Sequence, residues 1–371
     1  MSYPKVSGLS GNEIYCMRLK GLVPEGIVVG NSVQSMGFLS GVTSAFRGVL
    51  GGEIPEVTGM IHAGREAALE RMVQEAEREG IQGVAGVSSE LRSLEGNTEF
   101  LFVGSGVNGG GHFTSSGDAQ ELYCHMDAGY KPLSFAFGNI AYSVGVGGGI
   151  FGSLKTMMRG EIEEFSNVFN KTRHQCLERL VEQARQVGAN SVVGVRTSVM
   201  RFAGFHEMYM TGTAARNPWL PSNSSPVTSD LTGEEMWSMT SLGYLPVKLL
   251  ISTSVYSLGI VGGIKSAFKG LVRGEISDLT TLIYDARENV FERLKSDAAA
   301  AGADEVIGIK TYIVEIGSSL VEIVAVGTAV KKSPDAKVLT PTLPAQAIIR
   351  DKDTWMSGEA GFELQSTRAG G

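Results

Sequence analysis

The residues of this 371-residue chain that could hold a metal ion are few and scattered. Soft metals need thiolates, imidazoles or carboxylates that converge at ligand distance, and the chain has three cysteines and five histidines. Cys124 and His125 are adjacent, and His112 lies in the sequence GGGH. Adjacent side chains on a helix diverge by about 100°, which is poor geometry for a shared ligand. These three residues are therefore weak candidates for a divalent or heavy-metal site, and a site built between chains remains open.

Glutamates and arginines recur at a fixed spacing that is typical of ion pairs. Each Glu lies in a Gly-Glu-Ile tripeptide and an Arg follows twelve residues later, as in Glu53 and Arg65, Glu161 and Arg173, and Glu275 and Arg287. Each Arg falls on an apolar helical stripe, where an unpaired charge would be strongly unfavourable. We therefore expect buried or inter-unit ion pairs, in which the Glu of the same unit, or of the next unit around a ring, is the partner. A ligand or anion site at these positions is the alternative.

The glycine-rich runs do not form a nucleotide-binding motif. The run GVGGG at 145–149 has no Gly-Lys-Ser/Thr after it, and no GxGxxG lies between a strand and a helix with an acidic residue further on. No Ser-His-Asp or Cys-His arrangement recurs in the chain, and no paired carboxylates mark a cleft. The sequence therefore predicts no catalytic residues, no enzyme and no organic cofactor.

Composition narrows the class of protein further. The formal charge is −7 and the isoelectric point is near 5.4, which argues against a nucleic-acid partner because such binders neutralise phosphates with Lys and Arg. Three cysteines cannot form a disulfide framework, and the N-terminal sequence MSYPKVSG lacks the features of a signal peptide. The uncharged stretch 133–154 holds six glycines, so a strand, a turn and a helix start fit it better than a membrane span. We expect a cytoplasmic protein.

The chain consists of three copies of one unit. From each Gly-Glu-Ile, a glycine lies 27 residues after the Glu (Gly80, Gly188 and Gly302), and VAGV, VVGV or VIGI follows shortly after. The register holds without a gap over about 70 residues, a signature of repeat architectures. The copies span 8–106, 116–214 and 230–330, each with an N-terminal capped helix. The polar tail 332–371 has no counterpart in the repeat, and we expect it to be disordered or to form an arm on a neighbour.

Each copy has signals for the same elements in the same order. Capping boxes at Ser10, Asp118 and Thr232 begin a short helix. A strand follows at 26–34, 133–143 and 249–257, and a long helix at 57–79, 165–187 and 279–301. A hairpin ends the unit: 84–93 with 99–106, 192–202 with 207–215, and 306–315 with 320–330. Between strand and long helix lies an apolar, weakly basic segment, FLSGVTSAFRGVL in the first copy, which predicts a further helix.

The predicted fold is α+β, with three tandem two-layer α/β units and antiparallel three-stranded sheets. A three-stranded sheet covered by one helix layer leaves its edges and one face bare. Such a unit is marginal alone, and we expect it to bury the remaining surface against other units, within the chain and between chains. The apolar basic segments also suit an interfacial helix, so a membrane-surface oligomer is possible but not favoured.

The amino-acid sequence of the repeat resembles the YbjQ family, which is described as heavy-metal-binding. The resemblance is carried by Gly-Glu-Ile, by Ala286-Arg287-Glu288 with Glu292-Arg293-Leu294, by GADEVIGI at 302–309 and by VGTAV at 326–330. It implies a two-layer unit similar to dodecin, assembled into pentameric rings, and a metal or small ligand bound between units. The threefold fusion departs from single-domain members, so their ring size need not carry over.

These observations lead to one main hypothesis for function. We expect a non-enzymatic bacterial protein that self-assembles as a homo-oligomer, with five-fold symmetry favoured, into a ring or stacked rings that form a scaffold, shell or lumen. Three fused units cannot tile a single five-membered ring with whole chains, so five-fold symmetry requires five chains that stack three rings. A ring built from whole chains must hold a multiple of three units.

Overall fold

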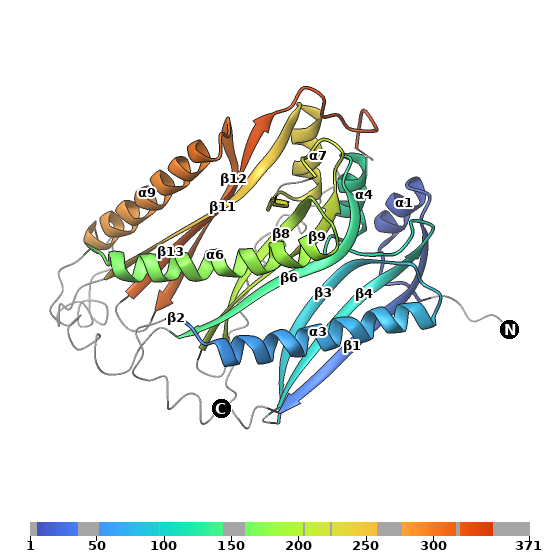
Figure 1. The fold of residues 1–371 in the computed structure, drawn as a ribbon, viewed down its shortest axis with the longest axis horizontal. Coiled ribbons are helices and arrows are strands. Elements are labelled where there is room, and N and C mark those ends of the chain that lie inside the picture. Colours follow the sequence, from blue (N-terminus) through green and yellow to red (C-terminus); the bar gives the residue numbers. More distant parts are fainter. Residues whose placement is uncertain are drawn as a thin grey trace. The chain divides into compact units, whose positions relative to one another are not determined.

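The computed structural model describes residues 6–35, 52–95, 97–143, 160–202, 205–222, 225–257, 277–316 and 320–343. Residues Met1–Leu339 form one compact unit, which contains all three repeats. Each repeat has a short helix, a long strand, a long helix and a hairpin, in this order (Figure 1). The first two repeats also have a two-residue strand before the long helix, and the corresponding residues of the third repeat are outside the described ranges.

The elements lie within a few residues of their predicted bounds. In the first repeat they are α1 (Gly11–Leu19), β1 (Val23–Ser35), β2 (Gly52–Glu53), α3 (Pro55–Arg78), β3 (Gly83–Leu94) and β4 (Asn97–Asn108). The second repeat has α4 (Ala119–Asp127), β6 (Lys131–Ser143), β7 (Gly160–Glu161), α6 (Glu163–Gln186), β8 (Ser191–Phe202) and β9 (Phe205–Arg216). The third has α7 (Gly233–Ser241), β11 (Tyr244–Ser257), α9 (Ser277–Ala300), β12 (Glu305–Ile316) and β13 (Leu320–Lys332). Two short strands lie in the segments between repeats, β5 (Phe113–Thr114) and β10 (Val227–Thr228).

The ends of the helices are fixed by local chemistry. Ser10, Asp118 and Thr232 each accept a hydrogen bond from the backbone of a Glu three residues later, and that Glu side chain accepts one from the cap residue's own N–H. These are complete capping boxes, and they satisfy amides that a helix start otherwise leaves unpaired. After the long helices, Gly80, Gly188 and Gly302 have φ of +70°, +70° and +66°, a left-handed conformation that glycine adopts without steric cost.

The sheets are larger than the three-stranded sheets that the sequence predicts. Their orders are β1-β4-β3-β5, β10-β8-β9-β6-β2 and β12-β13-β11-β7. The three long strands of each repeat are antiparallel, whereas β5 and β10 add in parallel to β3 and β8. The extra strand β2 comes from the first repeat but pairs with β6, and β7 comes from the second but pairs with β11. Short strands from adjacent segments therefore satisfy edge groups that a single unit would leave bare.

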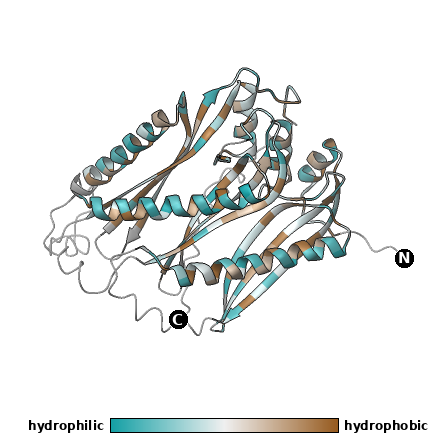
Figure 2. Cartoon of the chain, viewed as in Figure 1, coloured by the Kyte–Doolittle hydropathy of each residue, from teal (hydrophilic) through white to brown (hydrophobic). Residues whose placement is uncertain are grey.

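One face of each sheet packs against the long helix of its own repeat. In the first repeat Val28, Phe100 and Phe102 of the sheet pack with Ala68 and Met72 of α3, and apolar and polar residues alternate along the strands (Figure 2). The approach is close: a Cβ added at Gly30 would lie 2.2 Å from the Ala68 carbonyl oxygen. Glycine is therefore required there for the helix to reach the strand.

Several predictions concern residues that the structure does not describe. They are the apolar basic segments before each Gly-Glu-Ile, the carboxylate of Glu275 and residues 344–371 of the tail. The start of the tail is described, and Ala336 is buried beside Met236 and Leu245.

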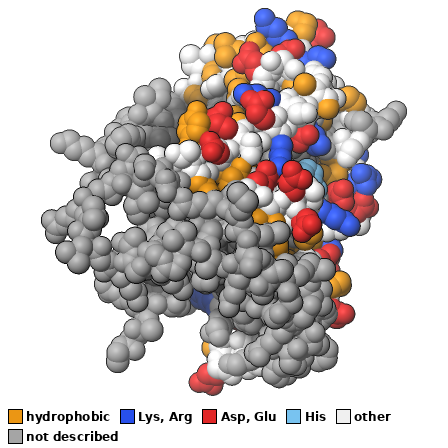
Figure 3. Space-filling model, turned by 90° about the vertical axis from the view of Figure 1, so that its left-hand side faces the viewer, with side chains coloured by type: hydrophobic (Ala, Val, Ile, Leu, Met, Phe, Trp, Pro, Cys, Tyr) orange, Lys and Arg blue, Asp and Glu red, His pale blue; other side chains and the backbone are white. Residues whose placement is uncertain are grey.

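Among the described residues, no helix combines the length and the apolar character that a membrane crossing needs. On the described surface in Figure 3, acidic and basic side chains are interspersed.

Candidate functional site

The candidate site is the contact that connects consecutive repeats, which we call the joint. At the first joint, Phe135, Phe137 and Ala141 on the outer face of β6 share one hydrophobic cluster with Val57 and Ile61 of α3. At the second joint, Leu249, Ile251 and Val255 of β11 share a cluster with Phe165 and Phe169 of α6. Each joint thus covers the outer sheet face of one repeat with the helix layer of the repeat before it.

A buried ion pair lies at the centre of the first joint. Nη2 of Arg65 on α3 donates to Oε2 of Glu207 on β9 at 2.8 Å, and the two side chains are 0% and 1% exposed. Nη1 of Arg65 donates to Oγ of Ser89, and the guanidinium carbon lies 3.6 Å from the centroid of the Tyr209 ring. Burial lowers the pKa of Arg65, but the attraction of Glu207 and Tyr209 outweighs it and holds this pKa above its ordinary value. Arg65 is therefore a permanent buried cation.

The second joint repeats this arrangement. Nη2 of Arg173 on α6 donates to both carboxylate oxygens of Glu322 on β13, at 2.8 and 2.7 Å, and to the Tyr142 hydroxyl at 2.7 Å. Both charged side chains are fully buried, and the Thr253 hydroxyl donates to the same carboxylate at 2.8 Å. Burial lowers the pKa of Arg173, but Glu322 and Tyr142 outweigh burial and raise it. Nε and Nη2 of the guanidinium donate to Glu322, while Nη1 has no hydrogen-bond partner. The bonds that are made offset part of the cost of burying the two charges.

The partners that the sequence predicts for these arginines are wrong. Glu53 pairs with Arg179 of the next repeat at 2.6 Å, and Glu161 pairs with Arg293 of the next repeat at 2.5 Å. The reason is strand pairing: Glu53 lies opposite Tyr142 on β6 and Glu161 opposite Tyr256 on β11. That pairing holds the first two Gly-Glu-Ile tripeptides on the following repeat and beside the following helix. Among the described residues, each joint therefore contains two of these Arg–Glu pairs, one buried and one partly exposed.

The glutamate of the partly exposed pair is held by several donors. Glu161 accepts hydrogen bonds from the hydroxyls of Ser254 at 2.6 Å and Ser166 at 2.8 Å, in addition to the bond from Arg293. Burial raises the pKa of Glu161, but these three donors together outweigh burial and lower this pKa below its ordinary value. The carboxylate is therefore ionised wherever the second joint is intact at neutral pH.

Sequence reasoning missed Glu207 and Glu322. Both lie five residues before a glycine of the last hairpin strand, Gly212 and Gly327, and Glu99 lies five residues before Gly104 in the first repeat. This recurrence was a usable signal. The arginine that pairs with each of these glutamates could not be found from spacing, because Arg65 and Glu207 are 142 residues apart in the chain.

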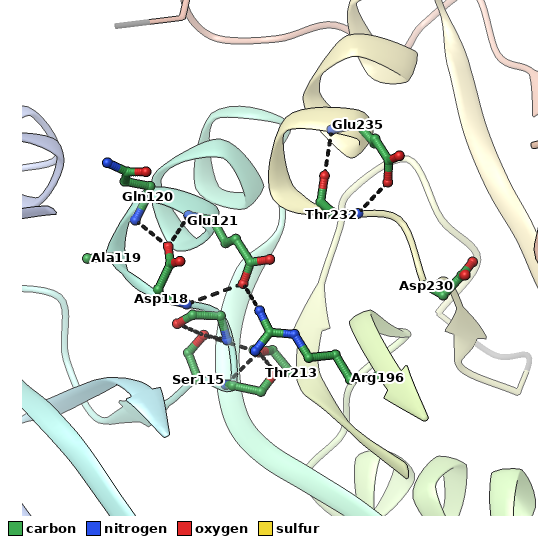
Figure 4. Close-up of polar contacts among 12 residues, drawn as sticks. Ser115, Asp118, Ala119, Gln120, Glu121, Arg196, Thr213, Asp230, Thr232 and Glu235 are labelled. Carbon is green, nitrogen blue, oxygen red and sulfur yellow. Dashed lines mark hydrogen bonds and ion pairs between the residues drawn. The ribbon is translucent and has the colours of Figure 1, made fainter. Parts of the chain in front are cut away.

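The short helices form a second line of contact between repeats. Helix α4 contacts both α1 and α7 (Figure 1). Asp127 at the end of α4 is fully buried; its carboxylate accepts from Nζ of Lys20 at 2.5 Å and from Nε1 of Trp237 on α7 at 2.8 Å. Figure 4 shows the start of α4, where the Glu121 capping carboxylate also accepts from Arg196 of β8 at 2.6 Å. Asp127 thus connects side chains from all three repeats.

The three candidate metal ligands differ in their surroundings. His112 is exposed, whereas Cys124 and His125 are buried. Burial raises the pKa of the Cys124 thiol, and burial followed by the charge of Arg196 lowers the pKa of His125 to about 4. Both ring nitrogens of His125 lack a hydrogen-bond partner. In the described part of the chain, no three His, Cys, Asp or Glu side chains gather in a group that could hold a metal ion, so these residues do not form a ligand set there.

The fold and the joints define a tandem array of α/β units that pack head to tail. The chain belongs to the YbjQ family, described as "Putative heavy-metal-binding", whose profile matches residues 21–108, 129–217 and 246–333. It is also similar to an encapsulin nanocompartment protein from Mycobacterium tuberculosis, with 26% identity over 240 residues that cover 62% of this chain and 90% of the relative.

Shorter relatives match parts of the chain. A UPF0145 protein from Acinetobacter baylyi is 30% identical over 101 residues, which cover 26% of this chain and 94% of that protein. One from Methanococcus maripaludis is 41% identical over 83 residues, which cover 22% of this chain and 74% of that protein. No solved structure matches the chain.

Proposed function

We propose that this chain is a non-enzymatic structural protein that self-assembles into a closed ring or stacked rings and so builds a shell, scaffold or lumen. The outer face of β1 is the observation that carries the proposal. Ile27, Val29 and Val33 on that face are 40%, 43% and 49% exposed. Their counterparts in the later repeats are at most 4% exposed: Phe135, Phe137, Ala141, Leu249, Ile251 and Val255. A face that is apolar in every copy and covered in two of them needs a partner in the third.

The relatives support the same proposal. The name of the Mycobacterium tuberculosis relative describes an encapsulin nanocompartment protein, and the alignment covers 90% of it. A nanocompartment requires protein that assembles, so a role in a shell or scaffold in the bacterial cytoplasm fits this chain. The proposal includes five-fold symmetry, because the resemblance to single-domain family members implies pentameric rings.

Metal or small-ligand binding between repeat units is the second candidate, and the family's description favours it. Because the described residues of one chain hold no group of three or more metal-ligating side chains, we propose this site where residues of two chains meet. This candidate is compatible with assembly and would add to it.

Native mass spectrometry combined with elemental analysis separates these possibilities. Assembly alone predicts a mass of several 39.4 kDa chains, without metal in stoichiometric amount. A single-chain mass across micromolar concentrations would overturn the proposal of self-assembly. A fixed ratio of metal to chain that survives dialysis would establish the second candidate.

A further inference from the structure

The first repeat carries an unfilled half of the joint. Glu99 is the counterpart of Glu207 and Glu322, which are buried against an arginine of the preceding repeat. Within these 371 residues no other repeat packs on Glu99, which is half-buried and accepts a hydrogen bond from Nδ2 of Asn31 at 3.1 Å. Its carboxylate therefore lies on the outer face of the sheet without the guanidinium that its counterparts receive.

The third repeat carries the other half. Arg287 is the counterpart of Arg65 and Arg173, which are fully buried, yet Arg287 is exposed on α9. The apolar side chains around the joint follow the same pattern. Ile309 and Ile313 of β12 are 46% and 47% exposed, whereas their second-repeat counterparts Val195 and Val199 pack in the second joint's cluster. Within these 371 residues no further copy of the repeat covers this surface.

At the first joint, His62 of α3 contacts Phe137 and Asn139 on β6, which are the counterparts of Val29 and Asn31 on β1. The His62 ring centroid lies 4.9 Å from that of Phe137, and its Nδ1 lies 3.0 Å from Oδ1 of Asn139.

The counterpart of His62 in the third repeat is Tyr284, which is 61% exposed on α9. A tyrosine carries an apolar ring and a polar tip, which suits contact with the exposed Val29 and the side chain of Asn31, as His62 contacts Phe137 and Asn139.

We infer that the third repeat of one chain docks on the first repeat of a second copy through this same joint, with Arg287 of one copy paired to Glu99 of the other and Tyr284 against Val29 and Asn31. The inference rests on the proposed function, because it names the interface through which the chain assembles. The two surfaces carry opposite charges at Arg287 and Glu99, and both expose apolar side chains. Both also repeat the residue arrangement of the two joints within the chain. A head-to-tail contact of this kind closes into a ring or continues as a filament, and either contains a multiple of three units.

Charge reversal tests the interface. Arg287→Glu and Glu99→Arg each place like charges in the joint, and each variant is expected to weaken assembly by about 100-fold or more, because a buried charge would face a like charge. Size-exclusion chromatography with light scattering then reports single chains for either variant. Lys295→Glu, an exposed change on the same helix α9, is the control and is expected to assemble as the wild type does.

Mixing the two variants in equal amounts gives the decisive result. Every joint in an alternating assembly joins opposite charges, either the native pair or the reversed pair, so large oligomers are expected to return. Recovery on mixing cannot come from misfolded chains.

Failure of the wild type to assemble would overturn the proposed function and this inference together. If the wild type assembles and neither reversal changes its mass, the interface is wrong, self-assembly stands, and the exposed faces belong to another occupant such as residues 344–371. If both reversals dissociate the oligomer and the mixture stays dissociated, the pairing of Arg287 with Glu99 is likewise wrong.

Discussion

The guanidinium of Arg173 and the carboxylate of Glu322 are 149 residues apart in the chain and 2.7 Å apart in space, and neither side chain is exposed. They come from different repeats, and the pair of Arg65 and Glu207 repeats the relationship one joint earlier. A charge buried this deeply is tolerated only with its partner in place. The repeats are therefore held in one fixed register, and removing one partner has a predictable cost.

Arg173→Ala is expected to lower the free energy of unfolding by about 3–5 kcal/mol, because it leaves the carboxylate of Glu322 buried without its cation. Urea denaturation followed by circular dichroism measures this loss. Lys295→Ala removes a surface ion pair on α9 and is the control, with unfolding expected to be unchanged within error. Equal effects of the two substitutions would mean that the buried pair contributes little to stability.

Removing both charges of the second joint is expected to harm the protein less than removing one. Arg173→Met and Glu322→Leu each strand a buried charge, whereas the double variant strands none and fills a similar volume. A double-mutant cycle in urea should therefore show the double variant to be more stable than either single variant. If the two losses simply add, the residues are not coupled and the pair is not the unit of stability.

Acid is expected to weaken the second joint through Glu161. Its pKa is lowered in the folded chain, so its contribution to stability is complete above the unfolded value of 4.5 and is lost as pH falls below that value and through the folded pKa. Glu161→Gln should lose less stability than the wild type between pH 5 and 3 in thermal unfolding. Glu164→Gln, an exposed change in the first turn of α6, should keep the wild-type dependence on pH. An unchanged pH profile in Glu161→Gln would contradict the assignment.

A second dependence on pH is expected from His125. Its pKa is lowered from 6.5 to about 4 by burial, so the unfolded chain binds a proton that the folded chain refuses. Stability should fall by about 3 kcal/mol as pH drops from 6.5 to 4 through this one group.

His125→Phe should flatten that part of the pH profile, since it removes two buried nitrogens that have no hydrogen-bond partner. Unfolding in urea at pH 7, 5.5 and 4.5 measures the effect. His112→Gln, at an exposed position, is the control and should retain the wild-type slope. A wild-type slope in His125→Phe would show that the histidine is accessible to protons in the folded chain.

The elements of the fold could be predicted because local signals fix them. The capping boxes at Ser10, Asp118 and Thr232 and the left-handed Gly80 act within a few residues of the backbone that they terminate. Each of these signals also occurs in all three copies of the repeat. The predicted bounds of α3, 57–79, differ by one or two residues from the observed Pro55–Arg78.

The partners of the ion pairs could not be predicted in the same way. Glu53 and Arg65 are close in sequence, but β2 leaves its own repeat to pair with β6 and takes Glu53 to Arg179. Each ion pair depends on which helix packs against which sheet face. The spacing of residues within one copy does not indicate this packing. The same reason explains part of the strand count, because β2 and β7 join sheets of the following repeat, whereas β5 and β10 come from the segments between repeats and join the sheet of the preceding repeat.

A symmetric electron cryo-microscopy reconstruction of the purified oligomer tests the central claim most directly. Head-to-tail assembly predicts that α9 of one chain covers β1 of its neighbour, with Arg287 within salt-bridge distance of Glu99 across the contact. Density in which the outer face of β1 meets solvent, or in which neighbouring chains touch through other surfaces, would contradict it.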